Sequence, residues 1–185
     1  MTTYKRAGVD IAEAEALKRS MARSLRTTDR RVLNRLGAFA SLVDGTFPGY
    51  RHPVLVLKTE EPGSKQKLAL EHGRVASICL DTVNHLINDI AVMGADPVAV
   101  QDCIVCGKLE KSVVFAMVKA LANACRAQGC VLTGGETSEQ PGVIPAGTYV
   151  LTSSIVGVVE KSRIIDGKRI RRGDIVLAVA SNGLH

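Results

Sequence analysis

The chain has 185 residues, of which 46% are hydrophobic and 23% charged, so it has enough apolar material for one globular domain with a real core. Aromatic residues make up 3% and tryptophan is absent, which argues against base stacking as a mode of binding. No apolar run has the length of a membrane span and the N-terminus lacks the apolar core of a signal peptide, so we expect a cytoplasmic protein with no membrane partner.

The net charge is +6, and much of the excess lies in two basic clusters. Such a charge suits an anionic small ligand as well as nucleic acid, and a solvated charged face is the simpler interpretation of most of these residues. We therefore expect no nucleic-acid partner. The clusters comprise Lys18, Arg19, Arg23, Arg26, Arg30, Arg31 and Arg35, and then Lys168, Arg169, Arg171 and Arg172.

The five cysteines are an odd number, which indicates reduced thiols rather than a disulfide framework. Cys103 and Cys106 form a C-x-x-C pair that Cys125 and Cys130 could complete as a zinc site, but the second pair has the wrong spacing for a zinc ribbon. Buried thiols that act as small hydrophobic side chains are the favoured interpretation.

Apolar periodicity and turn residues predict a chain that alternates strands and helices, which is typical of the α/β or α+β class. Asp10 and Glu13 resemble a capping box before the first helix, and a continuous apolar run predicts that the first strand is buried on both faces. The expected elements are a loop at 4–10, a helix at 11–25, a strand at 52–60, a turn at 61–65, a helix at 75–93, a strand at 97–107, a helix at 109–128, and strands at 130–135, 148–160 and 174–180.

Several carboxylates lie where neighbouring elements should meet. Asp89 borders the apolar stripe of the helix expected at 75–93, and burying a charge there is costly unless it is paired or bound to a metal ion. The other acids lie in, or just after, three successive strands: Glu60, Glu61, Asp102 and Glu136. Because ends of neighbouring strands meet at one edge of a sheet, we expect these acids to converge.

Acids gathered in this way in a basic chain need cations. Oxygen-rich sites of this kind suit Mg²⁺, which binds through a few carboxylates and keeps water or phosphate as further ligands. Lys65, in the turn at 61–65, would stand beside them as a phosphate-facing cation, and Gly63 would let the backbone approach. Two plainer interpretations stay open, namely that Asp102 pairs with Lys108 and that Glu61 is solvated.

Five stretches together resemble aminoimidazole ribonucleotide synthetase, also called phosphoribosylformylglycinamidine cyclo-ligase: YKRAGVDI, NDIAVMGADP, CGKL, GGETSEQPG and GVVEKSRIIDGKRIRRGDIVLAVASNGLH. The resemblance runs in register from about Tyr4 to His185. The ND and GGET elements are shared with a wider superfamily that includes formylglycinamidine ribonucleotide synthetase, selenophosphate synthetase, thiamine phosphate kinase and a hydrogenase-maturation protein. The first and last stretches are more specific to the cyclo-ligase.

The resemblance implies an ATP-binding α/β domain whose sheet is flanked by helices and pairs with the sheet of a second subunit, forming a barrel in a homodimer. On this basis we expect an N-terminal loop and helix (1–35), the ATP-binding domain (36–173) and the start of a second domain (174–185) that is otherwise absent. The chain stops just after an expected strand, as this division requires.

The implied reaction is ATP-dependent closure of formylglycinamidine ribonucleotide to aminoimidazole ribonucleotide, with release of ADP and phosphate, and the implied cofactors are ATP and Mg²⁺. The resemblance gives catalytic roles to Asp89, Glu136 and Lys65, and metal-binding roles to Glu60, Asp89 and Glu136. Residues implied to contact ATP are Glu60, Gly63, Ser64, Lys65, Asp102, Gly134 and Gly135. Gly134 and Gly135 are expected to turn the chain tightly at a strand end and so aim Glu136 at the phosphates.

One stretch departs from the family pattern. The family has DGVGTK where this chain has EEPGSK, residues 60–65. Glu60 has a longer arm than aspartate, and Glu61 and Pro62 stiffen a turn that should approach phosphate. We expect a retuned phosphate site. The alternatives are a sister enzyme with the same ATP chemistry, a non-catalytic paralogue that binds nucleotide, and, on charge alone, a nucleic-acid-binding module.

Overall fold

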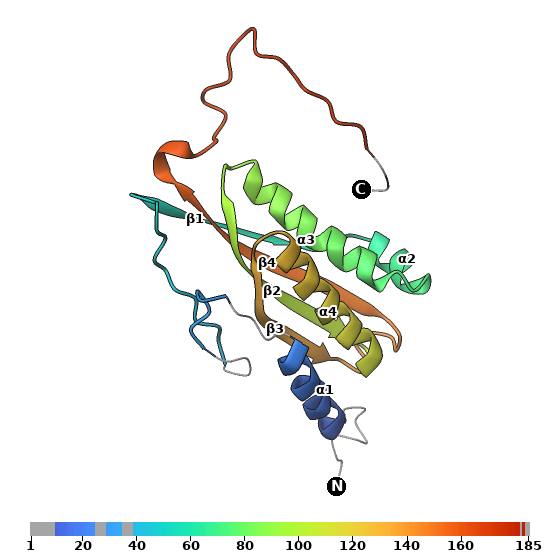
Figure 1. Cartoon of the computed structure of the whole chain (residues 1–185). Coiled ribbons are helices and arrows are strands. Elements are labelled where there is room, and N and C mark those ends of the chain that lie inside the picture. Colours follow the sequence, from blue (N-terminus) through green and yellow to red (C-terminus); the bar gives the residue numbers. More distant parts are fainter. Residues whose placement is uncertain (1–9, 25–28, 35–38, 182, 184–185) are drawn as a thin grey trace.

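The computed structural model describes residues 10–24, 29–34, 39–181 and 183, and in them a four-stranded sheet carries helices on one face (Figure 1). Apart from residue 10, the loop expected at 4–10 lies outside the described residues. None of the described helices is long and apolar enough to cross a membrane. The elements are α1 (Ile11–Ser24), β1 (Pro53–Glu60), α2 (Lys65–Glu71), α3 (Val75–Ala91), β2 (Asp96–Cys106), α4 (Lys111–Ala127), β3 (Val131–Glu139), β4 (Tyr149–Glu160) and the short 3₁₀ turn η1 (Lys161–Arg163).

The strands lie in the order β1-β4-β2-β3, which confirms the expected α/β class. β2 and β3 are parallel neighbours, and α4 supplies the crossover that parallel pairing requires. β4 runs antiparallel to both of its neighbours and separates β1 from β2. The carboxyl ends of β1, β2 and β3 therefore point the same way.

The main core lies between the sheet and helices α3 and α4. Leu86 and Ile90 of α3 have no exposed surface and recur at the helical spacing that the sequence predicted. Leu121 of α4 also has no exposed surface. Helix α1 packs on α4 through Leu17, and its first turn begins with the expected cap, in which the Glu13 amide donates to Asp10 Oδ1 at 3.1 Å.

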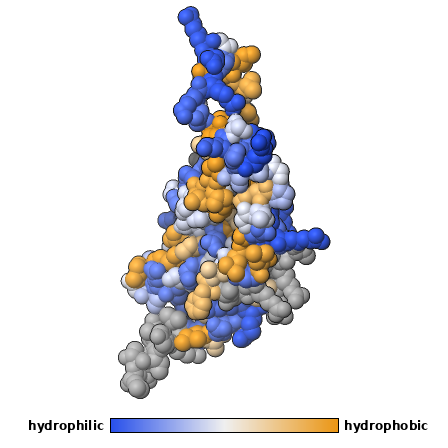
Figure 2. Space-filling view, turned by 90° about the vertical axis from the view of Figure 1, so that its left-hand side faces the viewer, coloured by the Kyte–Doolittle hydropathy of each residue, from blue (hydrophilic) through white to orange (hydrophobic). Residues whose placement is uncertain are grey.

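The other face of the sheet, here called the open face, is covered only in part by described residues. Val32, Val43, Phe47 and Tyr50 pack on a small apolar cluster of β2, β3 and β4. Leu55 and Leu57 of β1 are 55% and 72% exposed, so the expectation that β1 is buried on both faces is wrong for this chain alone. Apolar surface patches are visible among hydrophilic ones in Figure 2.

One further expectation is wrong, and one helix was not predicted. Residues 174–180 form no strand, and their apolar side chains are exposed, because no described segment pairs with them. Figure 1 shows this part of the chain running away from the sheet. The sequence also gave no sign of α2, whose seven residues include none that is buried.

The two glycines of GGET lie inside strand β3 and do not form the tight turn that was expected. β3 continues to Glu139, paired with β2 throughout, and the register shifts where Gly134 (φ +142°) faces Gln101. A Cβ on Gly135 would lie 2.0 Å from the carbonyl oxygen of Asp102 and 2.6 Å from its Oδ1. The glycines therefore provide a bulge and a close approach between strands.

We predict that Gly135→Ala destabilises the protein by about 3 kcal/mol, the upper range for an overpacked site, because the new methyl group meets the backbone of β2. Gly45→Ala is the matched control, since a Cβ there meets nothing within 4 Å. Urea unfolding of both variants measures the difference. Equal midpoints for the two variants would contradict the close packing of β3 on β2.

Candidate functional site

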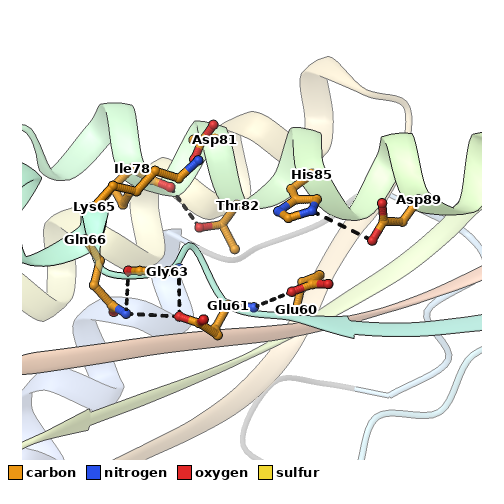
Figure 3. A network of polar contacts seen from close by, with 10 residues as sticks. All are labelled: Glu60, Glu61, Gly63, Lys65, Gln66, Ile78, Asp81, Thr82, His85 and Asp89. Carbon is orange, nitrogen blue, oxygen red and sulfur yellow. Dashed lines mark hydrogen bonds and ion pairs between the residues drawn. The ribbon is translucent and has the colours of Figure 1, made fainter. Parts of the chain in front are cut away.

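A lysine lies between two carboxylates at the end of β1. Lys58 Nζ is 2.7 Å from Glu60 Oε1 and 3.0 Å from Asp89 Oδ2 of helix α3. His85 Nε2 lies 3.9 Å from the same Asp89 oxygen, and Figure 3 shows this pair above Glu60. Glu60, His85 and Asp89 each offer a ligand atom within 4.8 Å of the others. We call Lys58, Glu60, His85 and Asp89 the β1-end cluster.

Its charges stabilise one another. The hydrogen bond from Lys58 holds the pKa of Glu60 below its ordinary value, and Glu60, followed by Asp89, raises the pKa of Lys58. Asp89 Oδ2 is buried and accepts no well-formed hydrogen bond from the described residues, so the ammonium at ion-pair distance is its main compensation. Lys58 and Glu60 therefore form a charged pair at neutral pH.

The turn between β1 and α2 is closed by Glu61. Its Oε2 accepts from the Gly63 amide at 2.7 Å and from Gln66 Nε2 at 3.2 Å, and Gly63 has a φ of +73° that favours glycine. Glu61 is exposed to solvent, and it also closes the turn. Ser64 precedes α2 and its hydroxyl makes no capping hydrogen bond.

Lys65 has an acidic partner, but it is not one of the acids that the sequence singled out. Its Nζ lies 2.6 Å from Asp81 Oδ2. Asp81, His85 and Asp89 recur every four residues on α3, so they form one polar stripe that faces the end of β1 and the following turn (Figure 3). Each acid of the stripe is matched by a lysine, Asp81 by Lys65 and Asp89 by Lys58.

A second group of candidate residues lies in one row across the sheet. Glu60 pairs with Ser153 of β4, Ser153 with Asp102 of β2, and Asp102 with Gly135 of β3. Asp102 is 7% exposed, and burial raises its pKa from the ordinary 3.8 to about 7. Ser153 is 1% exposed, and its Oγ has no hydrogen-bond partner among the described residues.

A cleft of about 870 Å³ is lined from both faces of the sheet: by Asp102 and Ser153, with Leu17 of α1, on the helix-bearing face, and by Gln101 and Cys103 on the open face. Gly134, Gly135 and Glu136 line it from β3. The residues expected to bind ATP therefore fall into two neighbouring groups, the β1-end cluster with its turn and this cleft. The row through Ser153 connects them.

Glu136 is not brought to the β1-end cluster. It is exposed and pairs with Cys103, which alternates with Asp102 along β2, so Glu136 projects from the open face whereas Asp102 faces the helices. β3 is also three strand spacings from β1, about 14 Å. One ion cannot be held by Glu60, Asp89 and Glu136 together, so the expected convergence of all the acids is only partial.

The pairing of Asp102 with Lys108 and the zinc alternative gain no support from the geometry, whereas Glu61 is exposed, as the solvated interpretation expects. Lys108 takes part in none of the ion pairs found among the described residues, so it does not neutralise Asp102. Cys103 and Cys106 lie three positions apart on β2 and so on opposite faces of the sheet, where they cannot share a tetrahedral ion.

Sequence reasoning missed four residues of the site: Lys58, Asp81, His85 and Ser153. The i, i+4, i+8 spacing of Asp81, His85 and Asp89 could have predicted one polar stripe on α3. The i, i+2 spacing of Lys58 and Glu60 could likewise have predicted that they share a face of β1. Ser153 carried no signal, since its place beside Asp102 depends on the register of β4.

We predict that Asp102 makes stability fall as the pH rises. Its pKa is higher in the folded chain than in the unfolded one, so its favourable contribution is present below about pH 4 and is lost as the pH rises through about 7. Between pH 5 and pH 8 the free energy of unfolding should fall by roughly 2–3 kcal/mol more in the wild type than in Asp102→Asn. Urea titrations at the two pH values measure this, and parallel pH profiles would contradict it.

Two solved structures share the fold at low sequence identity. The hydrogenase maturation protein HypE in complex with ATP matches 86% of this chain and 44% of its own, with a TM-score of 0.59 and 18% identity. Thiamine-monophosphate kinase from Stenotrophomonas maltophilia matches 84% of this chain and 44% of its own, with a TM-score of 0.57 and 17% identity. At such identities the likeness establishes the fold alone.

Curated relatives match at much higher identity. The phosphoribosylformylglycinamidine cyclo-ligase of Chromobacterium violaceum is 44% identical over 184 residues, which cover 99% of this chain and 53% of the relative. That of Bordetella petrii is 45% identical over 185 residues, which cover 99% of this chain and 52% of the relative. The chain therefore spans about half the length of the curated relatives it matches. Residues 51–159 match the family described as "AIR synthase related protein, N-terminal domain", and the chain belongs to this family.

Proposed function

We propose that this chain forms the ATP-binding half of an enzyme that closes formylglycinamidine ribonucleotide to aminoimidazole ribonucleotide, a step of purine biosynthesis, with ATP converted to ADP and phosphate. Relatives that are 44% and 45% identical over 99% of the chain carry the name of this cyclo-ligase. The observation that carries the proposal is the matched set of lysines and acids at the end of β1, beside a row of buried oxygen groups.

The chemistry asks for positioning and for charge at the phosphates, more than for a covalent nucleophile. ATP phosphorylates the formamide oxygen of the substrate, which turns that oxygen into a leaving group. The amidine nitrogen then attacks the same carbon, and phosphate departs as the ring closes. Lys65 would bind the transferred phosphoryl group, and Gly63 and Ser64 would offer backbone and hydroxyl contacts at the same turn.

Magnesium would be held by Glu60 and Asp89. Both carboxylates approach one point from two elements, at 2.7 and 3.0 Å from the same nitrogen, so each needs to close by less than about 1 Å to reach the 2.0–2.1 Å of a magnesium–oxygen bond. The ion would neutralise phosphate charge. Glu136 cannot complete this set. We assign Asp102, Gly134 and Gly135 to the nucleotide, whereas Glu136 lines the same cleft from the open face.

A homodimer formed through the open face is part of the proposal. Leu55 and Leu57 of β1 and Val150 of β4 are apolar and exposed there, as expected of a surface that a second sheet would cover. We place the ATP-binding domain at 36–173 and the start of a second domain at 174–185. The five free cysteines support a reducing compartment such as the cytoplasm.

We predict that Leu57→Glu weakens this dimer by at least about tenfold, because a charge would be buried in the interface. Sedimentation equilibrium of the full-length protein measures the association. Lys67→Glu, at a side chain that is 81% exposed on α2, is the control and should leave association unchanged. A wild-type protein that is monomeric, or a Leu57→Glu variant that dimerises normally, would contradict an interface on the open face.

The second candidate function is nucleotide binding without turnover. It is favoured by one observation, which is that both lysines of the site already have acidic partners, so phosphate and metal ion must compete for them. The altered turn at 60–65 also favours this second candidate, because Glu61 and Pro62 stiffen a segment that should approach phosphate. The sister enzymes of the superfamily are not favoured, since the relatives that match nearly the whole chain carry the cyclo-ligase name.

The test is ADP release by the full-length protein with Mg·ATP, with and without formylglycinamidine ribonucleotide. ADP that appears in step with aminoimidazole ribonucleotide supports the cyclo-ligase, whereas ATP that binds but is never hydrolysed supports the second candidate.

We predict that Lys65→Met lowers kcat by about 100-fold, because it removes a cation from the transferred phosphoryl group. Lys67→Met, two residues further along α2, should keep the wild-type rate, and equal rates for all three proteins would contradict the role of Lys65.

A further inference from the structure

The amino group of Lys58 lies at the point to which the carboxylates of Glu60 and Asp89 are directed. Its Nζ contacts Glu60 Oε1 at 2.7 Å and Asp89 Oδ2 at 3.0 Å, and the Asp89 oxygen is buried. The third potential ligand, His85, is turned toward the same oxygen at 3.9 Å. The cluster thus contains a cation of its own.

We propose that Lys58 is a tethered cation that holds the metal position between Glu60 and Asp89, so that a divalent ion binds there only by displacing it. An ion at a bonding distance of about 2 Å from both oxygens would lie almost on the present position of the ammonium group. Two cations at such a distance repel strongly, and the lysine must leave before the metal ion can enter.

Two acids that flank the cluster are already engaged. Asp81 is paired with Lys65 at 2.6 Å, and Glu61 closes the turn through Gly63 and Gln66. A phosphate group would give the displaced Lys58 a new partner, which is the one step here that rests on the proposed function. A divalent ion alone should therefore bind weakly, and an ion that arrives with a nucleotide should bind better.

Mn²⁺ binding to the full-length protein without nucleotide tests the proposal, with electron paramagnetic resonance reporting free Mn²⁺. Lys58→Met keeps the length of the side chain and removes its charge, and it should bind Mn²⁺ at least about tenfold more tightly than the wild type. Lys67→Met removes a charge of the same sign from an exposed position and should bind as the wild type does. Adding Asp89→Asn to Lys58→Met should abolish the gain, because it removes a ligand.

Equal affinity of Lys58→Met and wild type overturns the proposal, as does a gain that survives Asp89→Asn. If Lys58→Met does not fold without metal, the variant is refolded with and without Mn²⁺. Recovery of folded protein only with Mn²⁺ supports the proposal that the lysine replaces the ion, and no recovery in either buffer overturns the proposal. The readout is separate from turnover. A protein that forms no ADP can still show the gain in Mn²⁺ affinity, so failure of the cyclo-ligase proposal and failure of this one are distinguishable.

Discussion

Strand β4 lies between β1 and β2, and its register with both strands sets where the candidate site residues lie. Ser153 pairs with Glu60 on one side and with Asp102 on the other. The row continues to Gly135, where the absence of a side chain lets β3 approach Asp102. A shift of β4 by one residue would turn Ser153 to the open face and break the row that connects the two groups.

Charge balance is the second constraint on the site. The polar stripe of α3 would repel itself and the end of β1 if its acids were unpaired, and the two lysines remove that cost. The site is therefore stable without a bound ion, but its cations are already engaged. Binding of a nucleotide with its metal ion would exchange these partners rather than fill an empty position.

Much of the fold follows from the sequence because the signals were strong. Helices α3 and α4 have long apolar stripes, and β2 and β4 are rich in β-branched residues. The misses have local reasons. Residues 134–139 have the composition of a loop and are strand because β2 holds them, whereas residues 174–180 have the composition of a strand and lack a partner among the described residues.

The site was predictable only where one element sufficed. Asp89 could be placed from its helix alone, and Lys65 from its turn. The face to which Glu136 projects depends on a bulge, and the partner of Lys65 depends on how α3 packs over the turn. Both features depend on how two elements pack together, so the sequence pattern of one element alone cannot predict them.

The most direct measurement is a crystal structure of the full-length protein with Mg²⁺ and a non-hydrolysable ATP analogue. The account predicts phosphates on the helix-bearing side of the row, in contact with Lys65, with the ion on Glu60 and Asp89 and Lys58 moved off both carboxylates. Phosphates bound on the open face, or an ion held elsewhere while Lys58 still bridges Glu60 and Asp89, would contradict it.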